Sequence, residues 1–305
     1  MPHAADTRTT PLKTIALTAT AMLAFAANSL LCRLALQPGD IDPASFASIR
    51  LVSGAAVLFV IVRWASGSGG STGPAGSFSA PASGKADGLA ALMLFAYVAF
   101  FSFAYVTLPA GTGALILFGA VQLTMLGAGL QSGERFGLSG WLGLGLAIAG
   151  LVYLVFPGVA APPWQGVALM AAAGIAWGVY SLRGRKVADP LVATARNFIR
   201  AAPLALGLNL LFAAQAHGTP GGIALAVASG ALTSGVGYVI WYAALPRLTA
   251  LRAATVQLSV PLIAAFGGVA LLSEAVTPRL LLASMGILGG IAVVLMAKAP
   301  KGGRG

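Results

Sequence analysis

Charged residues are scarce in this 305-residue chain, because only 8% of it is Asp, Glu, Lys or Arg, whereas 58% is hydrophobic. A soluble domain usually carries about 25% charged residues, which keep its surface wetted. So few polar groups cannot cover the surface of a globule of this size in water. Much of the surface must therefore face the lipid of a membrane. The composition therefore excludes an ordinary soluble domain and predicts an integral membrane protein.

Acidic residues, histidine and cysteine are also few: seven Asp and Glu, two His and one Cys. The single Cys32 excludes an intrachain disulfide and a thiolate metal site. His3 and His217 lie outside the apolar runs, so no nucleophile–base–acid set can be assembled. A Gly-rich phosphate-binding loop is missing as well, which excludes ATP hydrolysis by this chain. We therefore expect no enzymatic activity, no cofactor and no bound metal.

No acidic residue falls inside an apolar run. Proton-coupled pumps commonly use acids or histidines within the membrane. Coupling through a buried carboxylate is therefore not expected, and a uniporter or a substrate exchanger fits better.

Ten apolar runs are long enough to cross the hydrocarbon core of a bilayer, which takes roughly 20 helical residues. They cover residues 14–36, 44–62, 88–108, 110–130, 138–156, 164–182, 195–214, 222–244, 250–272 and 279–297. The runs are continuously apolar rather than alternating with period two, which indicates helices and not a barrel. The sequence therefore predicts an all-α membrane protein with ten transmembrane helices.

The basic residues lie unevenly about these runs. The side that holds both termini receives 14 of the 18 Lys and Arg residues: Arg8, Lys13, Arg63, Lys85, Arg135, Arg183, Arg185, Lys186, Arg196, Arg247, Arg252, Lys298, Lys301 and Arg304. The other side receives Arg33 and Arg279, while Arg50 and Arg200 lie within runs. Because basic loops stay in the cytoplasm, we expect both termini there, in a bacterial inner membrane. The charge of +11 forms no patch with interleaved aromatics, so a nucleic acid partner is not expected.

The two halves of the chain share an internal repeat. Three segments recur in the same order: Asp42-Pro43 as Asp189-Pro190, Tyr105 to Pro109 as Tyr242 to Pro246, and Glu134 with Gly150 sixteen residues later as Glu274 with Gly290. Each half holds an odd number of spans, so the second half enters the membrane from the opposite side. An inverted repeat of this kind is typical of secondary transporters that bind substrate between their halves.

These features divide the chain into two five-helix units. We predict a cytoplasmic tail over residues 1–13, a first repeat over 14–156, a second repeat over 157–298 and a cytoplasmic tail over 299–305. Residues 66–87 are rich in Gly, Ser and Pro, which predicts a flexible cytoplasmic loop within the first repeat.

Several motifs resemble those of the EamA family of the drug/metabolite transporter superfamily. They are Phe25 to Arg33 and Trp177 to Arg185 in the opening spans, Asp-Pro followed by Arg50 or Arg196 in the second spans, and Glu followed by a glycine-rich run at the end of each half. The chain departs from the family pattern at Phe25, where Trp is usual. The resemblance implies a fold of two inverted repeats and the export of amino acids or other metabolites.

Polar and aromatic side chains within the spans are the candidate site residues. For substrate binding we name Asn28, Gln122, Trp177, Tyr180, Arg200, Tyr238 and Gln257. For gating or structural roles we name Arg50, Tyr105, Arg196 and Tyr242. An arginine inside a span is costly, so Arg200 is expected to anchor a carboxylate or phosphate; the alternative is snorkelling to the interface. The amides and aromatics have helix-to-helix packing as their alternative role.

The sequence thus predicts a secondary transporter of small metabolites that works by alternating access. The partners expected are a small-molecule substrate and the lipid bilayer, with the chain a monomer or homodimer. Glycines such as Gly286 and Gly290 predict close helix packing, within one chain or between two. The alternative functions are a membrane-embedded enzyme or accessory subunit acting on lipid-linked substrates, and a passive pore.

Overall fold

The computed structural model describes residues 11–67, 86–131, 137–156, 161–184, 187, 189–248 and 256–296. Most of these residues are helical, and the only β-pairing among them is an isolated bridge between Ile41 and Gly218. The predicted loop 66–87 lies outside the described residues for positions 68–85, and the predicted tails lie outside them for positions 1–10 and 299–305.

The helices follow the predicted runs closely. The first half contains α1 (Pro11–Leu36), α2 (Pro43–Gly67), α3 (Ala86–Tyr105), α4 (Ala110–Gln131) and α5 (Leu138–Val155). The second half contains α6 (Trp164–Gly184), α7 (Pro190–Leu211), α8 (Pro220–Ala228), the π-helix η3 (Ser229–Val236), α9 (Gly237–Ala244), α11 (Ser259–Leu272) and α12 (Pro278–Met296). The elements α8, η3 and α9 follow one another without a break and form one rod.

Eight of the described helices are long and apolar enough to cross a membrane, counting the rod Pro220–Ala244 as one. Two of the ten predicted spans do not meet both criteria. Helix α7 has 22 residues but is the most polar of the long helices, since it carries Arg196, Asn197, Arg200 and Asn209. Helix α11 is apolar but has only 14 residues in the described part of the chain. The protein is therefore an all-helical, multi-pass membrane protein.

The helix of the ninth predicted span is interrupted once within its described residues, at Leu258, whose backbone angles stay helical (φ −66°, ψ −15°). Val256 and Gln257 are helical, Leu258 is a turn, and α11 begins at Ser259. Pro261 explains the break, because its ring has no N–H and collides with the carbonyl group of the residue four positions earlier, which is Gln257.

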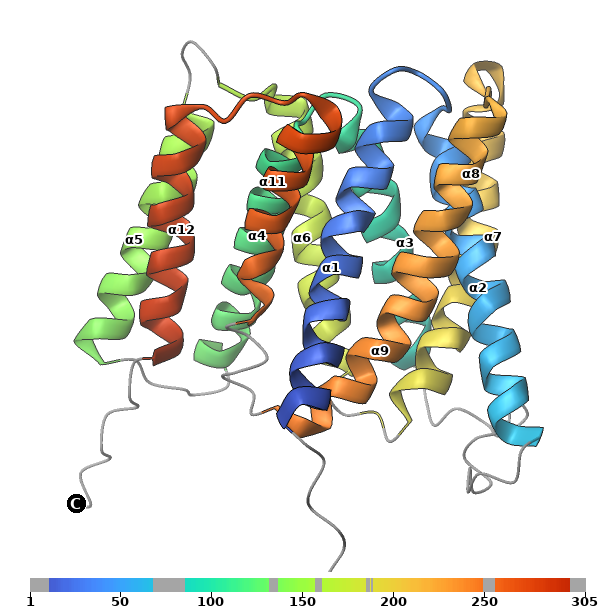
Figure 1. Cartoon of the computed structure of the whole chain (residues 1–305), viewed down its shortest axis with the longest axis horizontal. Helices are drawn as coiled ribbons and strands as arrows, with labels where there is room; N and C mark the ends of the chain where they lie inside the picture. The colour runs from blue at the N-terminus through green and yellow to red at the C-terminus, as the bar shows by residue number, and fades with distance from the viewer. Residues whose placement is uncertain are drawn as a thin grey trace, which may run out of the picture.

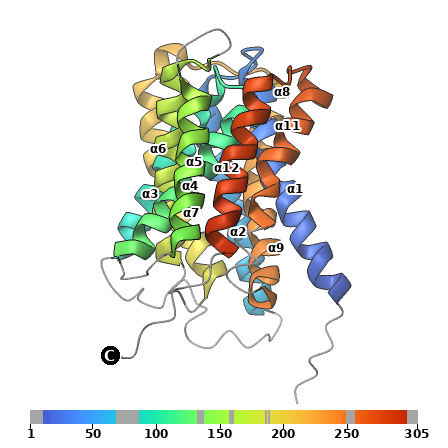
Figure 2. The ribbon, with the colours of Figure 1, turned by 90° about the vertical axis from the view of Figure 1, so that its left-hand side faces the viewer.

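The helices of the two halves interleave in one bundle (Figure 1). Helix α1 packs against α11, η3 and α9, while α2 packs against α7 and η3. Helix α3 packs against α6 and α7, and α4 packs against α6 and α11. At one end of the bundle α5 packs against α12, as the view turned by 90° also shows (Figure 2). Any cavity at the centre of the bundle is therefore bordered by both halves.

Glycines bring α5 and α12 into backbone contact. A Cβ atom added at Gly290 would lie 2.5 Å from the backbone nitrogen of Ala147 and the oxygen of Gly143, and one at Gly286 would lie 3.1 Å from the Cα atom of Gly150. Only glycine fits such approaches, which replace the hydrophobic driving force that is missing between helices in lipid. Gly286 and Gly290 therefore pack within the chain.

Two loops are joined on the side opposite the start of α1. The Asp42 carboxylate caps α2 by accepting hydrogen bonds from the N–H groups of Ala44 (3.1 Å) and Ser45 (2.8 Å), and it also accepts the N–H of His217 (3.0 Å). Burial disfavours the carboxylate, but these hydrogen bonds outweigh it and lower the pKa of Asp42 below its usual 3.8. The contact ties the loop before α2 to the loop before α8.

Candidate functional site

Two adjoining cavities lie between the halves of the bundle. The larger one, which we call the vestibule, has a volume of about 510 Å³ and is bordered by α1, α4, α6, α9 and the residues just before α11. It extends to Gly184 at the end of α6, Pro190 at the start of α7 and Leu245 after α9. These helix ends lie on the side of the bundle where α1 begins (Figure 1). The vestibule therefore opens on that side.

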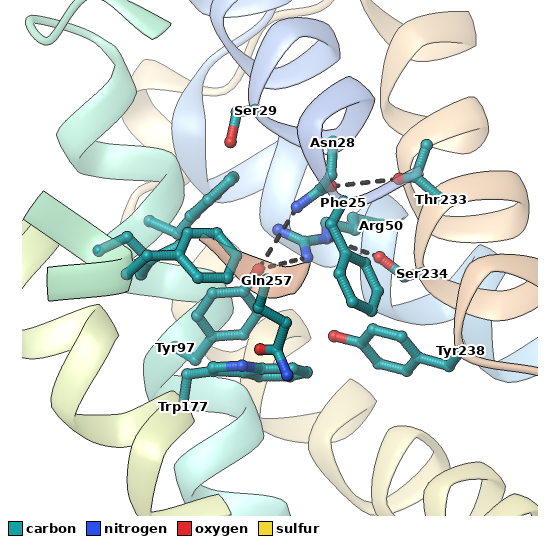
Figure 3. Close-up of a pocket in the computed structure, with 13 residues that line it drawn as sticks. Phe25, Asn28, Ser29, Arg50, Tyr97, Trp177, Thr233, Ser234, Tyr238 and Gln257 are labelled. Carbon is teal, nitrogen blue, oxygen red and sulfur yellow. Dashed lines mark hydrogen bonds between the residues drawn. The ribbon is translucent and has the colours of Figure 1, made fainter. Parts of the chain in front are cut away.

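The smaller cavity, which we call the crevice, continues the vestibule toward the centre of the bundle. It has a volume of about 20 Å³. Both cavities share Phe25, Trp177, Tyr238 and Gln257, so these four residues mark the passage from one to the other. The crevice ends at Asn28, Ser29, Arg50, Tyr97, Phe101, Thr233 and Ser234, among other residues (Figure 3).

An ion pair closes the bundle on the side opposite the vestibule. Arg33, in the last turn of α1, places its Nε 3.3 Å from Oε1 of Glu274, which lies between α11 and α12. Arg33 also donates to the carbonyl oxygens of Tyr105 (3.0 Å) and Val106 (2.9 Å), and the Glu274 carboxylate accepts the N–H of Ala110 at 2.8 Å. The two side chains are each only 11% exposed. We call this cluster the seal, because it joins both halves in one polar network.

The seal uses a helix terminus as well as a charge pair. Ala110 is the first residue of α4, and its N–H has no acceptor within its own helix. A carboxylate at that position is stabilised by the positive end of the helix dipole. Glu274 therefore has two partners at once, the Arg33 guanidinium and the start of α4.

The π-helix η3 supplies two of the polar residues that line the crevice, Thr233 and Ser234. Ser229 and Thr233 donate to Oδ1 of Asn28 at 2.7 and 3.3 Å, and Ser234 accepts a hydrogen bond from Arg50 Nε at 3.2 Å. The wider turn of a π-helix places these three hydroxyls toward α1 and α2. Such departures from α-helix geometry are frequent at functional sites.

Close packing holds η3 in place. A Cβ atom at Gly230 would collide with the side chain of Ser53 and with the backbone carbonyl of Arg50. The contact brings η3 against α2 directly beside the crevice. Gly54 is similar, because a Cβ there would lie 2.6 Å from the ring of Phe198.

Arg50 is the most buried charged side chain at the site, with 1% of its surface exposed. Its Nη2 donates to the hydroxyl oxygen of Tyr97 at 3.1 Å, and its guanidinium lies 5.1 and 5.0 Å from the ring centres of Tyr97 and Phe101. Cation–π contacts at such distances stabilise a desolvated cation in part. The Nη1 atom has no hydrogen-bond partner.

Aromatic rings line the passage. Trp177 contacts the rings of Tyr97 (4.8 Å between centroids), Tyr180 (5.3 Å) and Tyr238 (5.4 Å). Phe25 meets Tyr238 edge to face at 5.9 Å. The wall between vestibule and crevice is thus largely apolar, and its polar groups gather at the closed end.

The structure gathers most of the predicted site residues around these cavities. Asn28 lines the crevice, Gln122 and Tyr180 line the vestibule, and Trp177, Tyr238 and Gln257 border both. Of the residues named for gating or structure, Tyr242 lines the vestibule and Arg50 the crevice, whereas Tyr105 is buried at the seal. Their roles in transport stay predictions.

Two predicted residues lie elsewhere. The side chain of Arg200 is exposed, and it lines neither the vestibule nor the crevice. The face of α7 that packs inward carries Phe198, Ala201 and Ala205, and Arg200 projects from another face. Arg196 is half-buried and lines neither cavity. The arginine that reaches the central cavity is therefore Arg50 and not Arg200.

Several site residues were not identified from the sequence. Arg33 and Glu274 belong to sequence motifs but were not predicted to form a pair, and their pairing follows from the meeting of α1 with the loop after α11. The hydroxyls of η3 gave no signal, because Ser and Thr are common in membrane helices. Three sequence patterns did contain parts of the seal: the Phe25 to Arg33 motif, the Tyr105 to Pro109 repeat and the repeat of Glu134 as Glu274.

Comparisons with known proteins agree with this architecture. A protein of Pseudomonas aeruginosa whose name describes it as uncharacterised is 51% identical over 292 residues, which is 96% of each chain. A solved crystal structure has the same fold, with a TM-score of 0.66 and 22% identity over 93% of this chain and 98% of its own. A model of the EamA-like transporter family matches residues 12–156 and again residues 164–296. Since the two matches cover both halves, the chain belongs to the EamA-like transporter family.

Proposed function

We propose that this protein is a secondary transporter that carries a small metabolite across the bacterial inner membrane by alternating access, with export of amino acids or related compounds favoured. One observation carries the proposal. The central cavity is bordered by both halves, opens on the side where α1 begins and is closed on the other side by the seal of Arg33 and Glu274. Such a cavity gives a solute access from one side at a time.

A ten-span topology fits this proposal. The eight long apolar helices together with α7 and α11 make ten, an even number. Helix α1 begins and α12 ends on the same side of the bundle (Figure 1). The excess of basic residues on that side favours the cytoplasm as its location. The vestibule would then open to the cytoplasm, which is the loading side of an exporter.

A flux assay tests the function. Purified protein in proteoliposomes would be preloaded with amino acids, organic acids or polyamines, one class at a time, with and without a proton gradient. We expect saturable efflux of one class above that of empty vesicles. Absence of flux for every class with folded protein would contradict the proposal and favour an accessory role.

Matched variants test the site. Asn28→Ala, Gln122→Ala and Gln257→Ala change residues that line the cavities, whereas Arg200→Gln changes an exposed residue outside them. We expect the first three to lower flux or raise KM, and Arg200→Gln to behave as the parent. Unchanged kinetics in all three cavity variants would rule out this cavity as the substrate site.

A further inference from the structure

The buried guanidinium of Arg50 has an incomplete set of partners. Its two hydrogen bonds go to neutral oxygens, those of Ser234 and Tyr97, and Nη1 makes none. Buried side-chain nitrogens without a partner are rare in native structures and each calls for an explanation. A ligand with oxygen acceptors would provide the missing partner.

Among the described side chains, no carboxylate lies in the crevice or the vestibule to neutralise this charge. The acidic residues that the structure describes outside masked positions are Asp40, Asp42, Asp189 and Glu274, and none of them lines the crevice or the vestibule. The cavity therefore carries a fixed positive charge in low dielectric, where an ion of opposite sign is strongly attracted.

A second arginine lies along the same route. Among the described residues, only two buried side-chain nitrogen or oxygen atoms lack a hydrogen-bond partner: Nη1 of Arg50 and Nε of Arg183. Arg183 lines a cavity of about 60 Å³ that shares Tyr180, Val187 and Tyr242 with the vestibule. Both unsatisfied atoms thus belong to cations that border the path from the open side to the crevice.

The available donors fit a carboxylate. Tyr97 accepts hydrogen bonds from Arg50 and from Asn28 Nδ2 (3.4 Å), so its own O–H can donate to a ligand beside Nη1 of Arg50. Planar guanidinium groups bind carboxylates with particular geometric specificity. In Figure 3 the Arg50 guanidinium lies near Asn28, Tyr97 and Ser234.

The sizes of the two cavities constrain the shape of the ligand, because one is small and the other is large. The crevice, at about 20 Å³, holds a group no larger than one or two water molecules. The vestibule, at about 510 Å³, holds the remainder and is lined by rings such as Trp177, Trp241 and Tyr242. A single carboxylate on an apolar, aromatic body matches both.

We propose that the substrate is an organic monocarboxylate whose carboxylate binds Arg50 while its apolar body lies against the aromatic wall of the vestibule. This inference rests on the proposed transport function and assigns Arg50 as the anchor. Arg183, nearer the open side, attracts the same anion on its way to the crevice. Amines without a carboxylate are not substrates of this site, because they cannot pair with Arg50 and no acidic side chain among the described residues lines the cavities.

The test is a binding assay on the purified full-length protein in lipid nanodiscs. Trp177 borders both cavities and serves as an intrinsic fluorescence reporter. The probes share one aromatic body: phenylacetate, its neutral amide phenylacetamide, and the cation phenethylamine. We expect saturable binding of phenylacetate, binding of phenylacetamide weaker by about 10-fold or more, since one hydrogen bond to a charged group is lost, and no measurable binding of phenethylamine.

Variants locate the anion. Arg50→Gln is expected to remove the preference for phenylacetate over phenylacetamide, whereas Arg200→Gln, an arginine outside both cavities, keeps it. If Arg50→Gln does not fold, Arg50→Lys retains a charge and is expected to keep the preference at reduced affinity. Equal binding of acid and amide by the parent protein, or an undiminished preference in folded Arg50→Gln, would overturn the proposal.

The binding and flux results separate the two proposals. Carboxylate binding that depends on Arg50, without flux of any solute, would support the anion site and contradict the transporter. Saturable flux of solutes that lack a carboxylate, with unchanged kinetics in Arg50→Gln, would support the transporter and contradict the anion site.

Discussion

The seal of Arg33 and Glu274 should control which side of the protein is open. In Glu274→Gln the carboxylate becomes a neutral amide, which loses the ion pair with Arg33 and weakens the hydrogen bond from the N–H of Ala110. Hydrogen bonds to charged groups contribute about 1.5–3 kcal/mol. We take about 2 kcal/mol for the whole change, because the amide oxygen can still accept one bond. That energy corresponds to about a 30-fold shift toward the state with the seal open.

The size of the shift determines what can be observed. If the sealed state is favoured about 100-fold, the population of the open state rises from about 1% to about 23%. A property that is measured only in the open state should therefore change by more than tenfold. Transport rates alone would be a poor readout, because the step that limits the rate can be opening on either side of the membrane.

Cys32 is a native reporter for this opening. It is the single cysteine of the chain, is completely buried, and lies on α1 next to Arg33 and one turn beyond Asn28 and Ser29 of the crevice. A small membrane-impermeant maleimide added from the side of the seal should alkylate it only when the seal opens. We expect the alkylation rate in Glu274→Gln to exceed that of the parent by about 10- to 30-fold.

The control is Asp40→Asn, which removes an acid on the same side of the bundle that takes no part in the seal. It should leave the alkylation rate of Cys32 unchanged. Combining Glu274→Gln with Arg33→Gln should give an increase smaller than the product of the single effects, since both remove one interaction. Equal alkylation rates in parent and folded Glu274→Gln would refute the seal as the closing element.

Three further predictions follow from the packing, the loops and the charge of the ligand. Gly230→Ala forces a methyl group against Ser53 and the carbonyl of Arg50, and should lower stability by about 1–3 kcal/mol in thermal unfolding. Gly88→Ala, in helix α3 with open space around it, should be neutral or slightly stabilising. Asp42→Ala should lose a helix cap of about 1 kcal/mol at neutral pH. Because the folded-state pKa of Asp42 is lowered, that difference should persist above pH 3.8 and disappear as the pH falls through the folded-state value. Efflux of a monocarboxylate should be faster under an inside-negative membrane potential, which adds up to about 2.3 kcal/mol of driving force per 100 mV to the exit of one negative charge. A potassium diffusion potential imposed on the proteoliposomes tests this. An efflux rate that does not respond to the potential would contradict uncoupled anion movement.

The helices were predictable because their signal is local. A continuous apolar run of sufficient length has only one stable conformation in lipid, so the predicted run 110–130 corresponds to α4 at Ala110–Gln131. The break before α11 was harder to foresee, although its cause, Pro261, is visible in the sequence. A proline in the helix interior removes a hydrogen bond, but the sequence does not say whether the chain bends or breaks there.

The site was predictable in composition more than in geometry. Asn28, Trp177 and Gln257 were identified because polar or aromatic groups deep in a span tend to face the interior. Depth alone does not give the face of the helix: Arg200, predicted as an anchor, is exposed, whereas Arg50, predicted for gating or structure, lines the crevice. The hydroxyls of Ser229 and Ser234 are five residues apart, a spacing that an α-helix would direct to different faces, and only the π-helix brings both toward the crevice.

Arg50 has no acidic neighbour among the described residues that line the crevice, and this arrangement fits the proposed carrier function. A resident carboxylate would complete the partners of Arg50, and breaking such a buried pair to admit a substrate would cost several kcal/mol. The neutral oxygens of Tyr97 and Ser234 and the faces of two rings stabilise the cation only in part. The guanidinium can therefore persist in the empty protein and still gain from an anion, while the small crevice limits that gain to one head group. On the proposed site, a substrate held by one incomplete set of bonds would be bound specifically and would be released when the seal opens.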